Sequence, residues 1–141
     1  MVHALDEIRR VLAPGGVLID LRPLSDRWLV EVHSARETQE TGRVTDLPLG
    51  LQDDNAANQA MTEAESKGWF VREREGFFPL YYAWDSPAEM EEWIDEEWKD
   101  FIALGEGTKR ATRSAWASSD ADSRVRVKVK MLIARWAKTT E

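Results

Sequence analysis

Cysteine is absent from this 141-residue chain, and histidine occurs only twice. The absence of cysteine excludes a disulfide framework, a thiolate zinc site and a cysteine nucleophile. Because the two histidines are also not paired at helical spacing, we expect no metal site. No apolar run is long enough to span a bilayer, and Asp6 and Glu7 stand where a secretory signal would be basic and then hydrophobic. We therefore expect a cytoplasmic protein without a membrane partner.

A basic excess is missing as well, because 26 acidic residues outnumber 19 lysines and arginines and leave a net charge of -7. This charge disfavours binding to nucleic acid, which we do not expect as a partner. Residues 108–138 are locally basic, and a basic strand with nearby tryptophans could bind nucleic acid by phosphate contact and stacking. Pairing with the acidic run at residues 89–100 is the simpler expectation, and those acids predict a solvated helix face.

What the chain does have is a hydrophobic share of 43% with seven tryptophans, which predicts one folded domain over residues 1–141. Residues 5–12 carry apolar side chains at helical spacing, and Pro14-Gly15-Gly16 ends that helix. Residues 17–21 then predict a strand with apolar side chains on both faces, as when helices cover both sides of a sheet. Residues 28–33 and 42–49 predict a hairpin.

The second half of the sequence alternates between helical and extended patterns. Asp53 and Asp54 are expected to cap a helix that ends at Gly68, and residues 69–84 form an extended stretch that Pro79 keeps away from the sheet centre. Ser86-Pro87-Ala88-Glu89 is a capping box, so a helix starts there. Its expected buried stripe includes Trp93, Trp98, Phe101 and Ile102, and Gly105 is expected to stop it. A weaker helix at 108–117 leads to an alternating strand at 124–136 with one wet face.

The opening helix, then "RVLAPGGVLI", then a polar residue at the end of the strand, resembles the passage into the fifth strand of class I S-adenosylmethionine-dependent methyltransferases. The later order of helix, strand, helix and strand is similar to the C-terminal half of that family. The resemblance implies an α/β, partial Rossmann-like methyltransferase fold. Its core would be a three-stranded sheet (about 17–21, 69–84 and 124–136), with the last strand antiparallel between the other two. A β-hairpin insertion and flanking helices would complete it.

One departure from the family concerns the cofactor. Methyltransferases of this class hold S-adenosylmethionine on a glycine-rich turn after the first strand, and here only six residues precede Glu7. We therefore expect that the chain alone binds no cofactor, and that S-adenosylmethionine enters only if an N-terminal half is supplied. A G-x-G at Gly105 to Gly107 is interpreted as a helix C-terminus, because a lone G-x-G is weak evidence.

The candidate site residues form a possible substrate rim, and the residues that would carry catalysis stay unknown. Asp20 and Arg22 stand at the end of the first strand, the edge where open α/β sheets bind ligands. His33 is the better-placed histidine for a general base, although hairpin histidines are usually half-exposed strand residues. Tyr81 and Tyr82 point to opposite faces, so at least one could face a small-molecule ligand.

Three functions follow as expectations. The first is a methyltransferase-like C-terminal half that is inactive alone, whether a truncated reading frame, a degenerate product or one piece of a split enzyme. The second is a binding or assembly module that forms a homodimer, because the strand at 17–21 would otherwise leave an apolar edge unpaired. The third is an active methyltransferase with a small-molecule acceptor, whose N-terminal half is missing from this chain. The acceptor does not follow from the residues.

Overall fold

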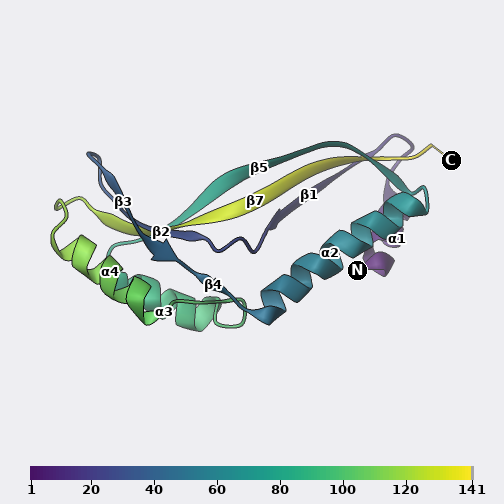
Figure 1. Cartoon of the computed structure of the whole chain (residues 1–141). Helices are drawn as coiled ribbons and strands as arrows, with labels where there is room; N and C mark the ends of the chain where they lie inside the picture. The colour runs from purple at the N-terminus through teal and green to yellow at the C-terminus, as the bar shows by residue number, and fades with distance from the viewer. Residues whose placement is uncertain (141) are drawn as a thin grey trace. The chain divides into compact units, whose positions relative to one another are not determined.

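The computed structural model describes residues 1–140, which form a mixed α/β structure (Figure 1). Its helices, within that range, are α1 (Val2–Val11), α2 (Pro48–Ser66), α3 (Pro87–Glu97) and α4 (Glu106–Ala117). Its strands are β1 (Val17–Pro23), β2 (Leu29–His33), β3 (Thr38–Arg43), β4 (Thr45–Asp46), β5 (Phe70–Trp84), β6 (Ile102–Ala103) and β7 (Arg124–Lys138).

The main sheet has five strands in the order β1-β7-β2-β3, with β5 also paired to β7. Strand β7 runs antiparallel to β1 and β2, and β2 runs antiparallel to β3. The expected three-stranded core is therefore wrong. The expected hairpin insertion is instead part of the sheet, because β2 hydrogen-bonds β7 along its whole length. Sequence periodicity identified the strands but carries no information on which strands pair.

By their contacts, the residues divide into two compact units. We call residues 1–24, 52–78 and 131–140 unit 1, and residues 25–51 and 79–130 unit 2. Strands β5 and β7 contribute to both, and each unit is described by itself below.

Unit 1 is a layer of two helices on one face of β1 and β7. The chain leaves α1 through a tight turn in which Gly15 adopts φ +74, a left-handed conformation that favours glycine. Its core contains Leu5 of α1, three residues of α2 (Ala60, Met61 and Ala64), Phe70, Ala134 and Trp136. Ala57, one turn earlier on α2, is buried as well. The other face of β1 is open, so the expectation that helices cover both faces of this strand is wrong.

In unit 2, α4 packs against β2 and β3, and α3 contacts α4 and β6. Its buried residues include Val30, Val32, Val125, Val127 and Met90. The hairpin is real, but its second strand is β3, which falls on the polar run rather than on residues 42–49. Polar side chains concealed β3 because β3 is an edge strand with exposed residues.

Three helix boundaries differ from the expected ones. Helix α2 begins at Pro48, so Asp53 and Asp54 lie inside it, although it ends before Gly68 as predicted. Helix α3 is capped by Ser86 as predicted, but it ends at Glu97. Ile102 then enters β6, and Gly105 is the N-cap of α4 rather than the stop of α3. The interpretation of the G-x-G as a helix C-terminus is therefore wrong.

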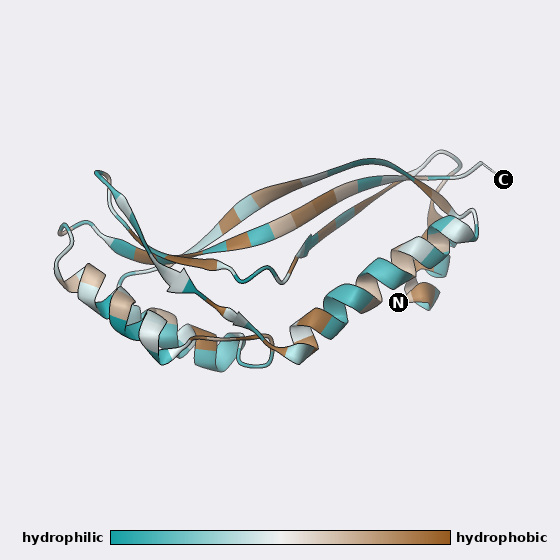
Figure 2. Cartoon of the chain, in the orientation of Figure 1, coloured by the Kyte–Doolittle hydropathy of each residue, from teal (hydrophilic) through white to brown (hydrophobic). Residues whose placement is uncertain are grey.

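The alternation of buried and exposed residues along β7 shifts by one residue part-way along the strand. Val125, Val127 and Val129 are buried in its first part, whereas Leu132, Ala134 and Trp136 are buried in its second part. Because side chains alternate along a strand, the covered face switches between residues 129 and 132. Ile133, which an unbroken alternation from Val125 would bury, is 41% exposed for this reason. Hydrophobic residues recur along both β5 and β7 (Figure 2).

Candidate functional site

Asp20 and Arg22 form the centre of the candidate site in unit 1. They are two residues apart on β1, so both side chains lie on the face that α1 and α2 cover. Arg22 Nε donates to Asp20 Oδ1 at 3.1 Å and Oδ2 at 3.3 Å, and Arg22 Nη2 donates to Asn58 Oδ1 on α2 at 2.8 Å. The side chains of the pair are only 17% and 14% exposed, so this is a charged pair largely withdrawn from water.

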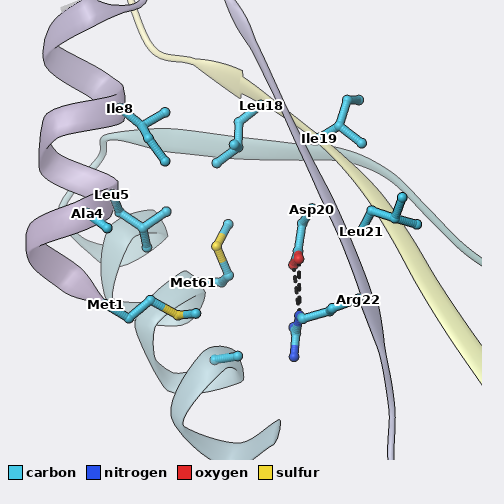
Figure 3. Close-up of a pocket in the computed structure, with 11 residues that line it drawn as sticks. Met1, Ala4, Leu5, Ile8, Leu18, Ile19, Asp20, Leu21, Arg22 and Met61 are labelled. Carbon is cyan, nitrogen blue, oxygen red and sulfur yellow. Dashed lines mark hydrogen bonds and ion pairs between the residues drawn. The ribbon is translucent and has the colours of Figure 1, made fainter. Parts of the chain in front are cut away.

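A pocket of about 230 Å³ lies on one side of this pair, between α1, α2 and β1 (Figure 3). The helices contribute only apolar side chains, among them Leu5, Ile8 and Met61. Asp20 and Arg22 supply the charges of the wall. An apolar wall with a few placed polar groups is the usual composition of a site for a small organic molecule.

A second pocket of about 240 Å³ shares Asp20, Arg22 and Met61 with the first. Its wall is more polar and comes from α2, β5 and β7; it also includes Asn58, Thr62, Glu65, Arg72, Glu75 and Trp136. Two donor atoms in these side chains, Arg22 Nη1 and Trp136 Nε1, are buried without a hydrogen-bond partner among residues 1–140. Unpaired buried donors are costly, so both favour an acceptor oxygen from water or a ligand.

The other predicted rim residues belong to unit 2. His33 ends β2, and its Nδ1 lies 2.7 Å from Thr38 Oγ1 across the hairpin. Among residues 1–140 no carboxylate is hydrogen-bonded to His33, so the arrangement lacks the group that would orient a general base. The rim candidates therefore belong to two units: Asp20 and Arg22, which contact each other, lie in unit 1, and His33, Tyr81 and Tyr82 lie in unit 2.

Tyr81 and Tyr82 have different surroundings, as expected for neighbours on a strand. The guanidinium carbon of Arg126 lies 4.1 Å from the centre of the Tyr81 ring. Tyr82 instead contacts Trp98, with ring centroids 4.9 Å apart at a near-perpendicular angle.

Sequence reasoning missed a buried charged pair in unit 2. Glu31 and Arg126 are cross-strand partners on β2 and β7, and Arg126 Nη2 lies 3.4 Å from Glu31 Oε2. Glu31 is 5% exposed, although charged residues are rarely buried this far. In the sequence, the alternation of Glu31 with Val30 and Val32 indicated only that Glu31 lies on a strand. Asn58 and Trp136 were also missed as site residues, because nothing in a helix or strand pattern marks a pocket wall.

Three basic residues of β7 form ion pairs with acids that lie outside α3. Arg124 pairs with Asp85, Lys130 with Asp26 and Arg135 with Glu73. On α3, Glu91 accepts a 2.7 Å hydrogen bond from Arg113 of α4. This hydrogen bond, together with the charge of Glu91, raises the pKa of the Arg113 guanidinium above its ordinary value.

Comparison of the chain with models of known families, with curated proteins and with solved structures found no match. Among residues 1–140, no helix combines the length and apolar character needed to cross a membrane. Within the same range, no three His, Asp or Glu side chains gather as a metal site.

Proposed function

We propose that the chain is the C-terminal half of a class I methyltransferase-like fold, which binds S-adenosylmethionine only together with a cofactor-binding half outside these 141 residues. The supporting observation is the position of β7, which runs antiparallel to β1 and lies between β1 and β5. The resemblance of "RVLAPGG" implies this order for the three strands. The sheet is otherwise mostly antiparallel, so it does not by itself indicate a Rossmann-like fold. The Rossmann-like relationship is therefore part of the proposal.

The turn that would hold the cofactor is missing from these residues. The G-x-G at Gly105 precedes a helix, but the strand before it is the two-residue β6, which pairs antiparallel with β4. The phosphate- or nucleoside-binding turns of doubly wound folds follow a parallel central strand instead. The proposal therefore assigns cofactor binding to another segment.

Strand β1 offers the surface on which that half would dock. Within the described residues it pairs only with β7, which leaves its second edge without a strand. Ile19 and Leu21 are 51% and 54% exposed, and Leu21 lies directly opposite Ile133 on the open face. An apolar, unpaired strand edge is a template for another strand, and natural proteins cover such edges.

The same surface supports a second candidate function, an assembly module in which two copies pair through β1. Light scattering at low micromolar concentration distinguishes them, because only the homodimer doubles the mass of the isolated chain. A Leu21→Lys variant should restore the monomer in that case.

In the active form of the enzyme, the proposal places a small-molecule methyl acceptor beside Asp20 and Arg22. Methyl transfer depends largely on holding the acceptor in line with the methyl group, so a pocket that positions a molecule suits this role. No residue is assigned to proton transfer.

Calorimetry tests the proposal in two parts. The 141-residue chain titrated with S-adenosylmethionine should give no binding heat. The product of the longest reading frame that contains these residues, or the chain mixed with a separate cofactor-binding half encoded beside it, should bind it. Micromolar binding by the chain alone overturns the proposal.

A further inference from the structure

Unit 2 contains a group of five aromatic side chains that we call the aromatic cluster: Trp28, Tyr82, Trp84, Trp93 and Trp98. Tyr82 and Trp84 share one face of β5, Trp93 lies on α3, and Trp98 is the C-cap of α3. The ring centroids of Tyr82 and Trp84 lie 6.4 Å apart, and each of these rings lies within 6.5 Å of Trp93 and Trp98. The cluster is thus one continuous aromatic surface.

Part of this surface faces solvent. Tyr82 is 36% exposed, and Trp93 is 38% exposed, although the sequence pattern placed it in the buried stripe of α3. Their rings are 6.5 Å apart and inclined by 36°, so two neighbouring ring surfaces stand at an angle to each other. A ring face carries negative charge density, which attracts cations.

Carboxylates flank Trp93 on α3. Glu89, Glu96 and Glu97 lie three or four positions from Trp93 on α3, which puts them beside it on the helix surface. Glu89 accepts a hydrogen bond from the backbone of Asp85. Glu96 and Glu97 form no ion pair within residues 1–140. Two nearby acids, Glu91 and Asp85, are already neutralised by arginines. The surface therefore keeps unpaired negative charge.

Three other aromatic rings, those of Trp69, Tyr81 and Trp136, have a cation over the ring. Arg9 and Lys67 lie 4.8 and 4.9 Å from the ring centre of Trp69. Arg126 covers Tyr81, and Arg72 lies 5.9 Å from the ring centre of Trp136. In contrast, no cation of residues 1–140 covers Tyr82, Trp84, Trp93 or Trp98. Within residues 1–140, Tyr82 and Trp93 therefore combine exposed rings with nearby carboxylates that form no ion pair, and no cation lies over either ring.

We propose that the exposed rings of Tyr82 and Trp93, with Glu96 and Glu97, bind an organic ammonium ion. An alkylated ammonium fits better than a small inorganic cation, because its methyl groups contact ring faces and its weak hydration is lost at little cost. The carboxylates supply long-range attraction, which salt weakens. This inference uses only residues of unit 2 and does not depend on the methyltransferase proposal.

The test uses the side-chain N–H signals of the seven tryptophans in a two-dimensional NMR spectrum of the full chain. Choline is the probe, and 3,3-dimethylbutan-1-ol, its neutral carbon analogue, is the control. Choline should shift the signals of Trp93, Trp84 and Trp98 saturably, and should leave those of Trp69, Trp116 and Trp136 in place. The neutral analogue should bind about two- to fivefold more weakly, which is the usual contribution of one cation–π contact at an exposed site.

Variants make the assignment specific. Glu96→Gln with Glu97→Gln should weaken choline binding while the protein keeps its tryptophan spectrum, and Trp93→Leu should remove the saturable shift. Trp116→Phe, on α4 and equally exposed, is the matched control and should bind choline as the parent chain does. The proposal is overturned if choline and its neutral analogue shift the signals equally, or if neither does. A lysine-rich peptide that shifts these signals when choline does not would assign the surface to a protein partner instead.

Discussion

Arg22 joins β1 to α2, because it pairs with Asp20 and donates to Asn58. Arg22→Met should lower the free energy of unfolding by about 2–4 kcal/mol, since it leaves the Asp20 carboxylate largely buried without its cation. The exposed pair Arg10–Glu7 is the control, and Arg10→Met should cost less than about 0.5 kcal/mol. Urea denaturation measures both. Equal losses in the two variants would show that burial of the Asp20 pair has no energetic consequence.

Glu31 and Arg126 provide a second test at the residue scale. Replacing Glu31 by Leu should cost about 3 kcal/mol, because the Arg126 guanidinium then keeps only its contact with the Tyr81 ring. The double variant Glu31→Leu, Arg126→Met should recover much of this loss, since no buried charge is left unpaired. Urea denaturation of the parent chain, the two single variants and the double variant gives the coupling free energy between the two side chains. Strictly additive losses would contradict a direct interaction between the two side chains.

At the scale of elements, β3 and α4 come close at one glycine. Gly42 has φ +155, and a Cβ atom there would collide with the side chain of Thr108 on α4. Gly42→Ala should therefore lower the free energy of unfolding by about 2 kcal/mol or more, because both the backbone and the helix contact resist it.

Gly76 in β5 is the matched control, since a Cβ there meets nothing within 4 Å. Gly76→Ala should change the free energy of unfolding by less than about 1 kcal/mol in either direction. Thermal unfolding followed by circular dichroism compares the two variants. If Gly42→Ala melts like Gly76→Ala, the close approach of β3 and α4 is not present in solution.

The elements also show what sequence reasoning could reach. Ser86 and Pro87 predicted the start of α3 correctly, because an N-cap is a local signal; Ser86 Oγ indeed accepts from the Glu89 backbone. The end of α3, by contrast, is not marked by a local sequence signal. Ile102 continued the apolar pattern of the helix, yet tertiary contact with β4 placed it in a strand. Strand β3 was missed since an exposed edge strand needs no hydrophobic alternation.

At the scale of the whole molecule, the long strands were predictable and their partners were not. Residues 69–84 and 124–136 correspond closely to β5 and β7, whereas the five-stranded order depends on contacts between distant segments. Of the candidate site, Asp20 and Arg22 are in contact as neighbours on one strand face, which alternation predicts. Their partner Asn58 is 36 residues away from Arg22, and no local pattern reveals it.

At the same scale, we propose that these 141 residues form one half of a methyl-transferring fold. The most direct measurement is calorimetric titration of S-adenosylmethionine into the 141-residue chain and, in parallel, into the product of the longest reading frame that includes it. We predict no binding heat for the first and saturable binding for the second. Micromolar binding to the isolated chain, or no binding to the longer product and to any mixture with an adjacent cofactor-binding half, would contradict this claim.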